Sequence, residues 1–144
     1  MSDCVLDASV VAFSNGDIAG RRPGNVFDRR LAAIERVVSG ERSLRYNSKL
    51  LGEYKGLVRV YRNDVIELLF IILADKGVLV KRNTLSRQEH AVATGKCRWP
   101  SHDQHLLAAA VGGIDPVIVV TESHLASCAA RVLTYFAVYV EHLA

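Results

Sequence analysis

Residues 97–125 read CRWPSHDQHLLAAAVGGIDPVIVVTESHL and predict a helix, a turn and a strand in direct succession. Ser101 and Gln104 have the spacing of a capping box, so we expect the helix to begin at about His102. Asp103 then falls in its first turn, at the head of the apolar stripe that the following leucines and alanines form. An acid in that position faces the sheet rather than open water.

The strand that follows this helix places polar residues where parallel sheets bind ligands. Two glycines end the helix, and the β-branched run VIVV at 117–120 suits a strand that is covered on both faces. Thr121, Glu122 and Ser123 come directly after it. Because open parallel sheets place ligand sites at the carboxyl ends of their strands, we expect these three side chains to share a crevice with Asp103.

Composition and charge set the broad class of the protein. The chain has 144 residues, of which 50% are hydrophobic and 23% charged, so we expect residues 1–144 to form a single domain with a sizeable core. The formal net charge is +3 and the pI is about 8.9, which makes a polyanionic partner plausible. The same modest excess is common in proteins that bind nothing acidic.

Cysteine usage and hydropathy indicate the compartment. Cys4, Cys97 and Cys128 are widely spaced and form no C-x-x-C pair, which argues against a disulfide framework or a zinc site. The most apolar run, VIELLFIILA at 65–74, is too short to span a bilayer and contains Glu67. We therefore expect a cytoplasmic protein with no membrane association and no targeting signal.

The run CVLDASVV at 4–11 predicts a first buried strand that carries an acid. Asp7 and Ser9 are two residues apart, so in a strand they would point to the same side. A carboxylate in a buried strand is costly unless it is paired. Asp7 is thus an N-cap, a hydrogen-bonded core residue or a functional one, and its position alone leaves these open.

A second candidate acid lies in the middle of the chain. Residues 47–61 predict a helix whose cap is Asn47 or Ser48, and Glu53 falls within its apolar stripe. The alternative is that Glu53 lies at the edge of the stripe and pairs with Lys49.

Two basic segments could guide a nucleic acid. Residues 14–25 are rich in Gly, Asn, Ser and Pro and predict a loop that carries Arg21 and Arg22. Lys81 and Arg82 belong to a second basic stretch. A solvated surface explains the arginine pair at least as well, and it is the default explanation for the second stretch.

The remaining pattern predicts the fold class. Helices are expected at 27–38, at 63–77 and at about 87–93, with a short strand candidate, VLVKR, at 78–82. The tail predicts a last strand at 131–134 and then a final amphipathic helix through Phe136. Alternating strands and helices indicate a parallel α/β sheet with helices on both faces.

Asp7, Glu53 and Asp103 share one property, because each acid lies on an element whose apolar face should meet the same sheet. Carboxylates that cluster repel one another unless a hard cation neutralises them. Oxygen ligands in this number favour Mg²⁺ or Mn²⁺ over zinc. Phosphodiester hydrolysis is the chemistry that such a site most commonly serves.

With these residues in place, the sequence resembles the PIN-domain family, which includes the VapC-type toxin ribonucleases of toxin–antitoxin pairs. The resemblance covers most of the chain and depends on VLDASVV with Asp7, SKLLGEYKGLV with Glu53, SHDQHLLAAA with Asp103 and VVTESHL with Thr121. The order and spacing match a family whose acids follow the first strand, lie in a middle helix, begin a late helix and follow the next strand.

The resemblance implies a PIN-like three-layer α/β/α sandwich with a central, mostly parallel sheet. It also implies an endoribonuclease for single-stranded RNA, with 5′-phosphate and 3′-hydroxyl products and an antitoxin protein as partner. The family often has Thr-x-Asp after the late strand, whereas this chain has Thr121, Glu122 and Ser123. Ser123 could hold a metal-bound water, or Glu122 could replace the acid, and either arrangement weakens a second metal site.

Two histidines near Asp103 and one strongly apolar helix also bear on the function. His102 and His105 lack other ligands at zinc spacing, so we expect no zinc site and give them a minor, RNA-facing role. The helix at 63–77 is apolar around most of its circumference, which predicts a homodimer through this helix or the C-terminal one. The alternative function is a catalytically silent PIN-like domain that binds RNA or a protein.

Overall fold

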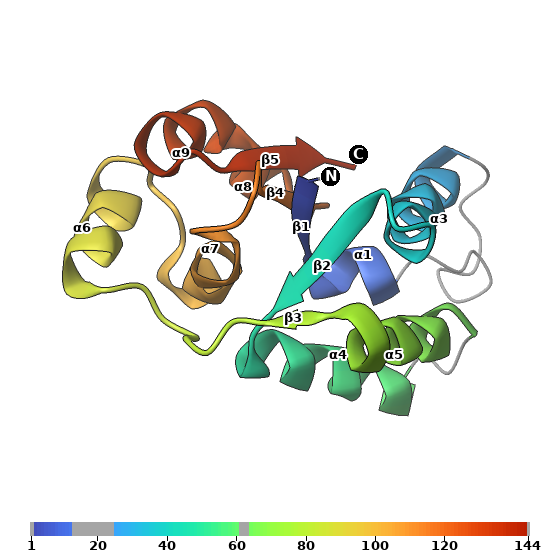
Figure 1. Cartoon of the computed structure of the whole chain (residues 1–144). Helices are drawn as coiled ribbons and strands as arrows, with labels where there is room; N and C mark the ends of the chain where they lie inside the picture. Colours follow the sequence, from blue (N-terminus) through green and yellow to red (C-terminus); the bar gives the residue numbers. More distant parts are fainter. Residues whose placement is uncertain (1, 13–24, 61–63, 144) are drawn as a thin grey trace.

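The computed structural model of the chain describes residues 2–12, 25–60 and 64–143. Within these ranges, five strands form one sheet in the order β3-β2-β1-β4-β5, and every pairing between them is parallel (Figure 1). The strands are β1 (Ser2–Leu6), β2 (Arg42–Tyr46), β3 (Val78–Leu79), β4 (Val117–Val120) and β5 (Tyr139–His142).

Helices cover both faces of this sheet and make a three-layer α/β/α sandwich (Figure 1). One layer holds α1 (Ala8–Ala12), α3 (Asn25–Val38), α4 (Ser48–Val60) and α5 (Asp64–Lys76). The other holds α6 (Arg87–Gly95), the 3₁₀ turn η1 (Ser101–Asp103), α7 (Gln104–Ala110), α8 (Ser123–Ser127) and α9 (Ala129–Phe136). The α/β fold class predicted from the sequence is confirmed, and the sheet is parallel in all its described pairings rather than in most.

The direction of winding changes between β1 and β4. The chain runs from β1 to β2 and on to β3 at one edge, then crosses back to β4 and continues to β5 at the other edge. In an open parallel sheet the carboxyl ends of two strands at such a switch point form a crevice for a ligand. Here those ends are joined by the backbone, because the Asp7 N–H donates to the Val119 carbonyl at 3.0 Å.

The core lies on the two central strands and on α7. All residues from Leu106 to Ala110 are buried, as are Val5, Leu6 and Ile118. Each large apolar side chain that is fully buried stabilises the fold by roughly 1.5–3 kcal/mol. Strand 117–120 is therefore the doubly covered strand that its β-branched residues predict.

Two polar side chains of the β2 region fix α7 across the sheet. Near its start, Asn47 Nδ2 donates to the His105 carbonyl at 2.9 Å. At its end, Arg45 Nε donates to the Ala109 carbonyl at 2.8 Å, which satisfies a carbonyl that the helix terminus leaves free. The first turn of α7 therefore lies at the carboxyl edge of the sheet.

The predicted middle elements match the structure closely. The helices expected at 27–38, 47–61, 63–77 and 87–93 correspond to α3, α4, α5 and α6. The strand candidate VLVKR contains β3. Within the described ranges, no helix has the length and apolar character needed to cross a membrane.

The two ends of the chain differ from the prediction. β1 stops at Leu6 instead of continuing to residue 11, and a helix begins at Ala8, with the Val10 N–H donating to the Asp7 carbonyl at 3.0 Å. Apolar residues continue past the turn, so hydropathy alone shows no boundary there. The predicted order of the last two elements is wrong, because the helix α9 comes first and the strand β5 follows it. Ala137 caps the C-terminus of α9 in the left-handed region (φ 55°).

Candidate active site

Asp7 follows the carboxyl end of β1 directly, and hydrogen bonds in a chain of two hydroxyl groups hold its side chain. Ser9 Oγ donates to Asp7 Oδ2 at 2.7 Å, and Thr121 Oγ1 donates to Ser9 Oγ at 2.7 Å. The expectation that Asp7 and Ser9 share a strand face is wrong, because Ser9 lies in the first turn of α1. The hydroxyl chain nevertheless joins the ends of β1 and β4 at the switch point.

The electrostatic surroundings of Asp7 show which acids lie near it. Burial raises the pKa of the Asp7 carboxyl, the hydrogen bond from Ser9 opposes that rise, and the charges of Glu53, Asp103 and Glu122 raise the pKa further. The four carboxylates come from four different segments of the chain. The fold therefore brings all three predicted acids, together with Glu122, within electrostatic range at one edge of the sheet.

Asp103 ends the 3₁₀ turn and precedes α7, but its side chain caps neither element. Its Oδ2 atom is buried and accepts no hydrogen bond from the described residues, although His102 Nε2 lies within ion-pair distance, 3.2 Å away. Only 16% of the side chain is exposed. A buried carboxylate oxygen without a donor is costly, and a nearby cation would offset that cost.

The capping box predicted from Ser101 and Gln104 is absent among the described residues of this turn. The chain enters the 3₁₀ turn from Pro100, and the Gln104 side chain instead accepts a hydrogen bond from the Leu85 N–H at 3.3 Å. Trp99 Nε1 donates to the Asp103 carbonyl at 2.9 Å and fixes the backbone of the turn. A tertiary contact has replaced the local cap that the sequence spacing predicted.

Glu53 projects from α4 toward α7 and contacts a histidine. Its Oε1 atom lies 2.5 Å from His105 Nε2, rather than near Lys49. The His105 side chain is 2% exposed and that of Glu53 39%. The predicted RNA-facing role of His105 is therefore wrong, because the ring lies in the interior and bridges the two helix layers.

Asn47 is a further residue that organises this edge. Its Oδ1 accepts from the Leu50 N–H at 3.0 Å and caps α4, as one of the two predicted candidates. Its Nδ2 donates to the carbonyls of His105 and Arg82 at 2.9 and 3.2 Å. The sequence pattern predicts the cap, but it cannot predict the hydrogen bonds to two carbonyls that lie far away in the sequence.

Tyr54 secures α4 against the end of β1. The side chain is fully buried, its hydroxyl donates to the Leu6 carbonyl at 2.5 Å, and burial raises the pKa of the phenol well above its usual range. The contact joins Leu6, which directly precedes Asp7, to Tyr54, which directly follows Glu53. It therefore fixes the separation of two candidate acids.

The three residues after β4 differ in how far they are exposed and in what they contact. Thr121 is half-buried and bonds Ser9, whereas Glu122 and Ser123 are exposed, with Ser123 beginning α8. Only Glu122 among them adds negative charge near Asp7. Of the two replacements considered for the fourth acid, Glu122 is the one with a described electrostatic effect on the site.

The predicted basic residues have different surroundings. Lys81 is exposed, whereas Arg82 makes two contacts with Glu89, at 2.5 and 3.2 Å. The Arg82 hydrogen bonds hold the pKa of the Glu89 carboxyl at about 2. Arg21 and Arg22 lie outside the described residues, and RNA contact by any of these four residues stays a prediction.

The donor set at the carboxyl edge fits a hydrated Mg²⁺ or Mn²⁺ ion in its chemistry. Within the described part of the chain, no three His, Cys, Asp or Glu side chains form a ready-made metal cluster. Mg²⁺ usually keeps several waters and is bound through one or two carboxylates, so a closed protein cage is not required. Asp103 Oδ2, which is buried and accepts no hydrogen bond from the described segments, is the oxygen that such an ion would satisfy.

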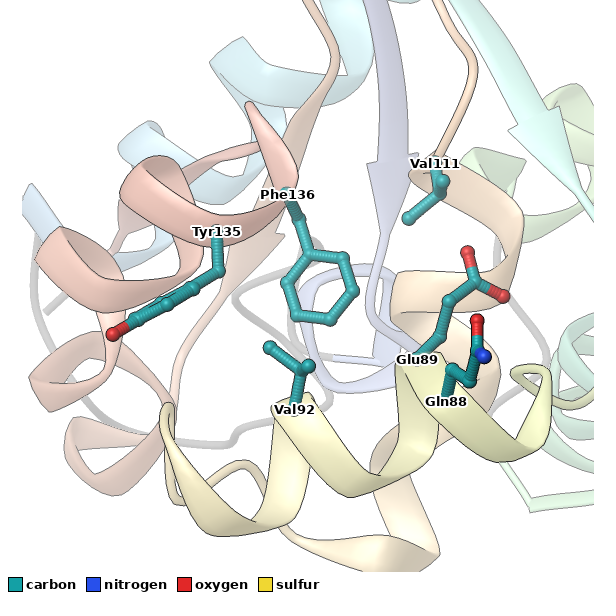
Figure 2. Close-up of a pocket in the computed structure, with 6 residues that line it drawn as sticks. All are labelled: Gln88, Glu89, Val92, Val111, Tyr135 and Phe136. Carbon is teal, nitrogen blue, oxygen red and sulfur yellow. The ribbon is translucent and has the colours of Figure 1, made fainter.

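A hollow of about 320 Å³ lies elsewhere, between α6, α9 and the end of α7 (Figure 2). Figure 2 shows the Phe136 ring pointing toward Val92, while the Tyr135 ring points away from Val92. Val111 lines this hollow and lies at the opposite end of α7 from Asp103. The hollow is therefore separate from the acids at the carboxyl edge.

Comparison of the chain with protein-family models, with curated proteins and with solved structures found no match. The residues at the carboxyl edge and their contacts therefore carry the functional inference.

Proposed function

We propose that this protein is a PIN-type endoribonuclease that depends on Mg²⁺ or Mn²⁺ and hydrolyses phosphodiester bonds of single-stranded RNA. The observation that carries the proposal is the group of carboxylates around Asp7 at the switch point of the sheet, where each added negative charge raises the pKa of that acid. Such a group is stabilised when a divalent cation neutralises it.

In this proposal Asp7, Glu53 and Asp103 hold the ion. When bound, such an ion would neutralise these carboxylates and would supply the Lewis acid for phosphodiester hydrolysis. Ser9 and Thr121 orient Asp7 through the hydroxyl chain, and they make no contact with the substrate in this scheme. Glu122 and Ser123 act as supporting residues, with Glu122 supplying the further negative charge.

The exposed cation Lys81, with Arg21, Arg22 and Arg82, would guide the RNA backbone in the same proposal. Phosphate contacts of this kind position a nucleic acid without reading its sequence. An antitoxin protein and a second copy of the chain are the proposed protein partners. The three cysteines are free and buried, which fits a protein of the reducing cytoplasm.

A catalytically silent PIN-like domain that binds RNA or a protein is the second candidate. It is favoured by Ser123 at the position where the family often has an acid. It is also favoured because the described acids form no closed group of three ligands.

Cleavage of mixed single-stranded RNA by purified protein separates the two candidates. The reactions contain Mn²⁺, Mg²⁺ or chelator, and Glu53→Gln and Asp103→Asn proteins purified in parallel control for a contaminating nuclease. The nuclease proposal expects cleavage with metal only, 5′-phosphate ends and loss of activity in both variants. RNA binding without cleavage under every metal condition would favour the silent domain.

A further inference from the structure

The contact between Glu53 and His105 joins a proposed metal ligand to a side chain in the interior. The His105 ring is 2% exposed, and its Nε2 lies 2.5 Å from Glu53 Oε1. The other ring nitrogen, Nδ1, is buried and has no hydrogen-bond partner among the described residues. Glu53 is therefore the side chain that the ring contacts by hydrogen bonding, and the buried ring cannot reach an RNA substrate.

The unpartnered nitrogen indicates which tautomer the ring adopts. If Nδ1 carried the proton, a buried N–H donor would be left without an acceptor, which is rare in folded proteins. If Nε2 carries the proton, Nδ1 is a bare acceptor, and Nε2–H donates to the Glu53 carboxylate. The second arrangement fixes the position of the Glu53 carboxylate, because its Oε1 atom accepts this hydrogen bond.

The backbone around this pair is fixed from both sides. Asn47 caps α4, which carries Glu53, and the same amide donates to the carbonyl of His105 on α7. Tyr54 fixes α4 again, one residue after Glu53. The two side chains therefore meet because their helices are held in place, and not through a chance surface contact.

We propose that His105 is a positioning residue for metal binding, an inference that rests on the proposed function. Its Nε2–H donates to Oε1 of Glu53 and so fixes the orientation of that carboxylate, whose other oxygen would then be free to hold a cation. Hydrogen-bond partners of metal-ligating carboxylates typically change metal affinity or activity by 10–100-fold when they are removed. His105 acts only through Glu53.

Three substitutions separate hydrogen bonding from packing. His105→Gln places an amide N–H near the position of Nε2 and keeps the donor, whereas His105→Asn is the matched amide that is too short to reach Glu53. His105→Leu retains apolar volume without any donor. The readouts are Mn²⁺ affinity, from the electron paramagnetic resonance of free Mn²⁺, folding by circular dichroism, and RNA cleavage.

The proposal expects Mn²⁺ affinity in His105→Asn and His105→Leu to fall by about 10–100-fold, with His105→Gln closer to wild type than either. Cleavage should follow the same order. Unchanged Mn²⁺ affinity in a folded His105→Asn or His105→Leu protein would overturn the proposal. An equal loss in all three variants, or failure of both amide variants to fold, would also overturn it, because the ring would then be a packing residue.

Wild-type protein decides the proposed function separately. If wild type binds no Mn²⁺ and cleaves no RNA, the metal-dependent nuclease is refuted, and the positioning role with it. If wild type binds Mn²⁺ and the histidine variants bind it equally well, the nuclease proposal stands and only the role of His105 is lost.

Discussion

Asp7 is an acid that folding makes harder to ionise, and this has a consequence for stability against pH. Below its ordinary pKa of about 3.9, Asp7 is protonated in both the folded and the unfolded chain. As the pH rises, the unfolded chain loses this proton first, so the folded state is destabilised until Asp7 ionises there too. The penalty is then fully present at neutral pH.

Asp7→Asn should remove that penalty while its amide oxygen still accepts the hydrogen bond from Ser9. In chelator, we expect the variant to gain stability relative to wild type as the pH rises above about 4 toward neutral, because the folded wild type must then ionise a buried acid. Urea unfolding across this range measures the difference. Asp75→Asn, which changes an exposed acid of α5, is the control. If the stability of Asp7→Asn relative to wild type changes with pH no more than that of Asp75→Asn, the prediction is contradicted.

Asp103→Asn tests the metal site directly. Because Asp103 Oδ2 is buried without a hydrogen bond and the side chain makes no cap, the metal-free variant should be at least as stable as wild type. The stabilisation that Mn²⁺ gives by binding only the folded state should be largely lost. Thermal melts of both proteins, with chelator and with Mn²⁺, provide the measurement.

Asp115→Asn is the matched control for this experiment, since Asp115 is exposed and precedes β4 at the other end of that strand. It should keep the full Mn²⁺ response. If Asp103 only favours the helix N-terminus, its substitution should instead cost about 0.3–1 kcal/mol and leave the metal response unchanged. That pattern would remove Asp103 from the metal site.

Single residues differed in how well the sequence predicted them. Asp7, Glu53 and Asp103 could be found because each interrupts an apolar pattern, and such an interruption is visible along the chain. His105 and Asn47 could not be assigned their roles, because their partners lie 52 and 58 residues away in the sequence. A contact between helices on opposite faces of a sheet leaves no local spacing to detect.

At the scale of the elements, Asn47 joins the end of β2, the start of α4 and the first turn of α7. Asn47→Ala removes the cap of α4, which is worth about 1 kcal/mol, and leaves two carbonyls without their amide donor. We expect a loss of about 2–4 kcal/mol of unfolding free energy in urea.

Ser48→Ala is the control for this prediction, because the Ser48 hydroxyl is exposed and contacts only Asn83 among the described residues. It should change stability by about 0.5 kcal/mol or less. A loss of only about 1 kcal/mol in Asn47→Ala would show that Asn47 acts as a cap alone, and an effect as small as that of Ser48→Ala would contradict the prediction altogether.

The elements that the sequence predicted well are long and strongly periodic, such as α3 and α4. The errors fall on short elements near turns. β1 and α1 share one continuous apolar run, so their boundary is set by where the sheet ends and not by hydropathy. The order of α9 and β5 was missed because a short window with both apolar and β-branched residues fits either period.

For the whole molecule, the exposed apolar residues identify where a second copy could bind. Ile71 on α5 is 64% exposed, and Leu68 on α5 and Leu79 on the edge strand β3 are exposed as well. Edge strands and apolar patches of this kind favour association. If the proposed homodimer forms through α5, Ile71→Glu should give the monomeric mass by light scattering at micromolar concentration.

Leu133→Glu is the matched substitution on the C-terminal helix α9, where Leu133 is 40% exposed. It should leave the dimer intact if α5 is the interface. Loss of the dimer in this variant alone would place the interface on α9, and a monomeric wild type would contradict both alternatives.

The hydroxyl chain at the switch point also sets when this edge of the molecule can be completed during synthesis. Thr121 and Ser9, which bond one another, are 112 residues apart. At ribosomal rates of ~5–20 residues per second, roughly 6–22 s pass between the appearance of one hydroxyl and that of the other. Throughout that interval β1 has left the ribosome without its neighbour β4, so a nascent chain cannot assemble the carboxylate group around Asp7 until synthesis has passed β4.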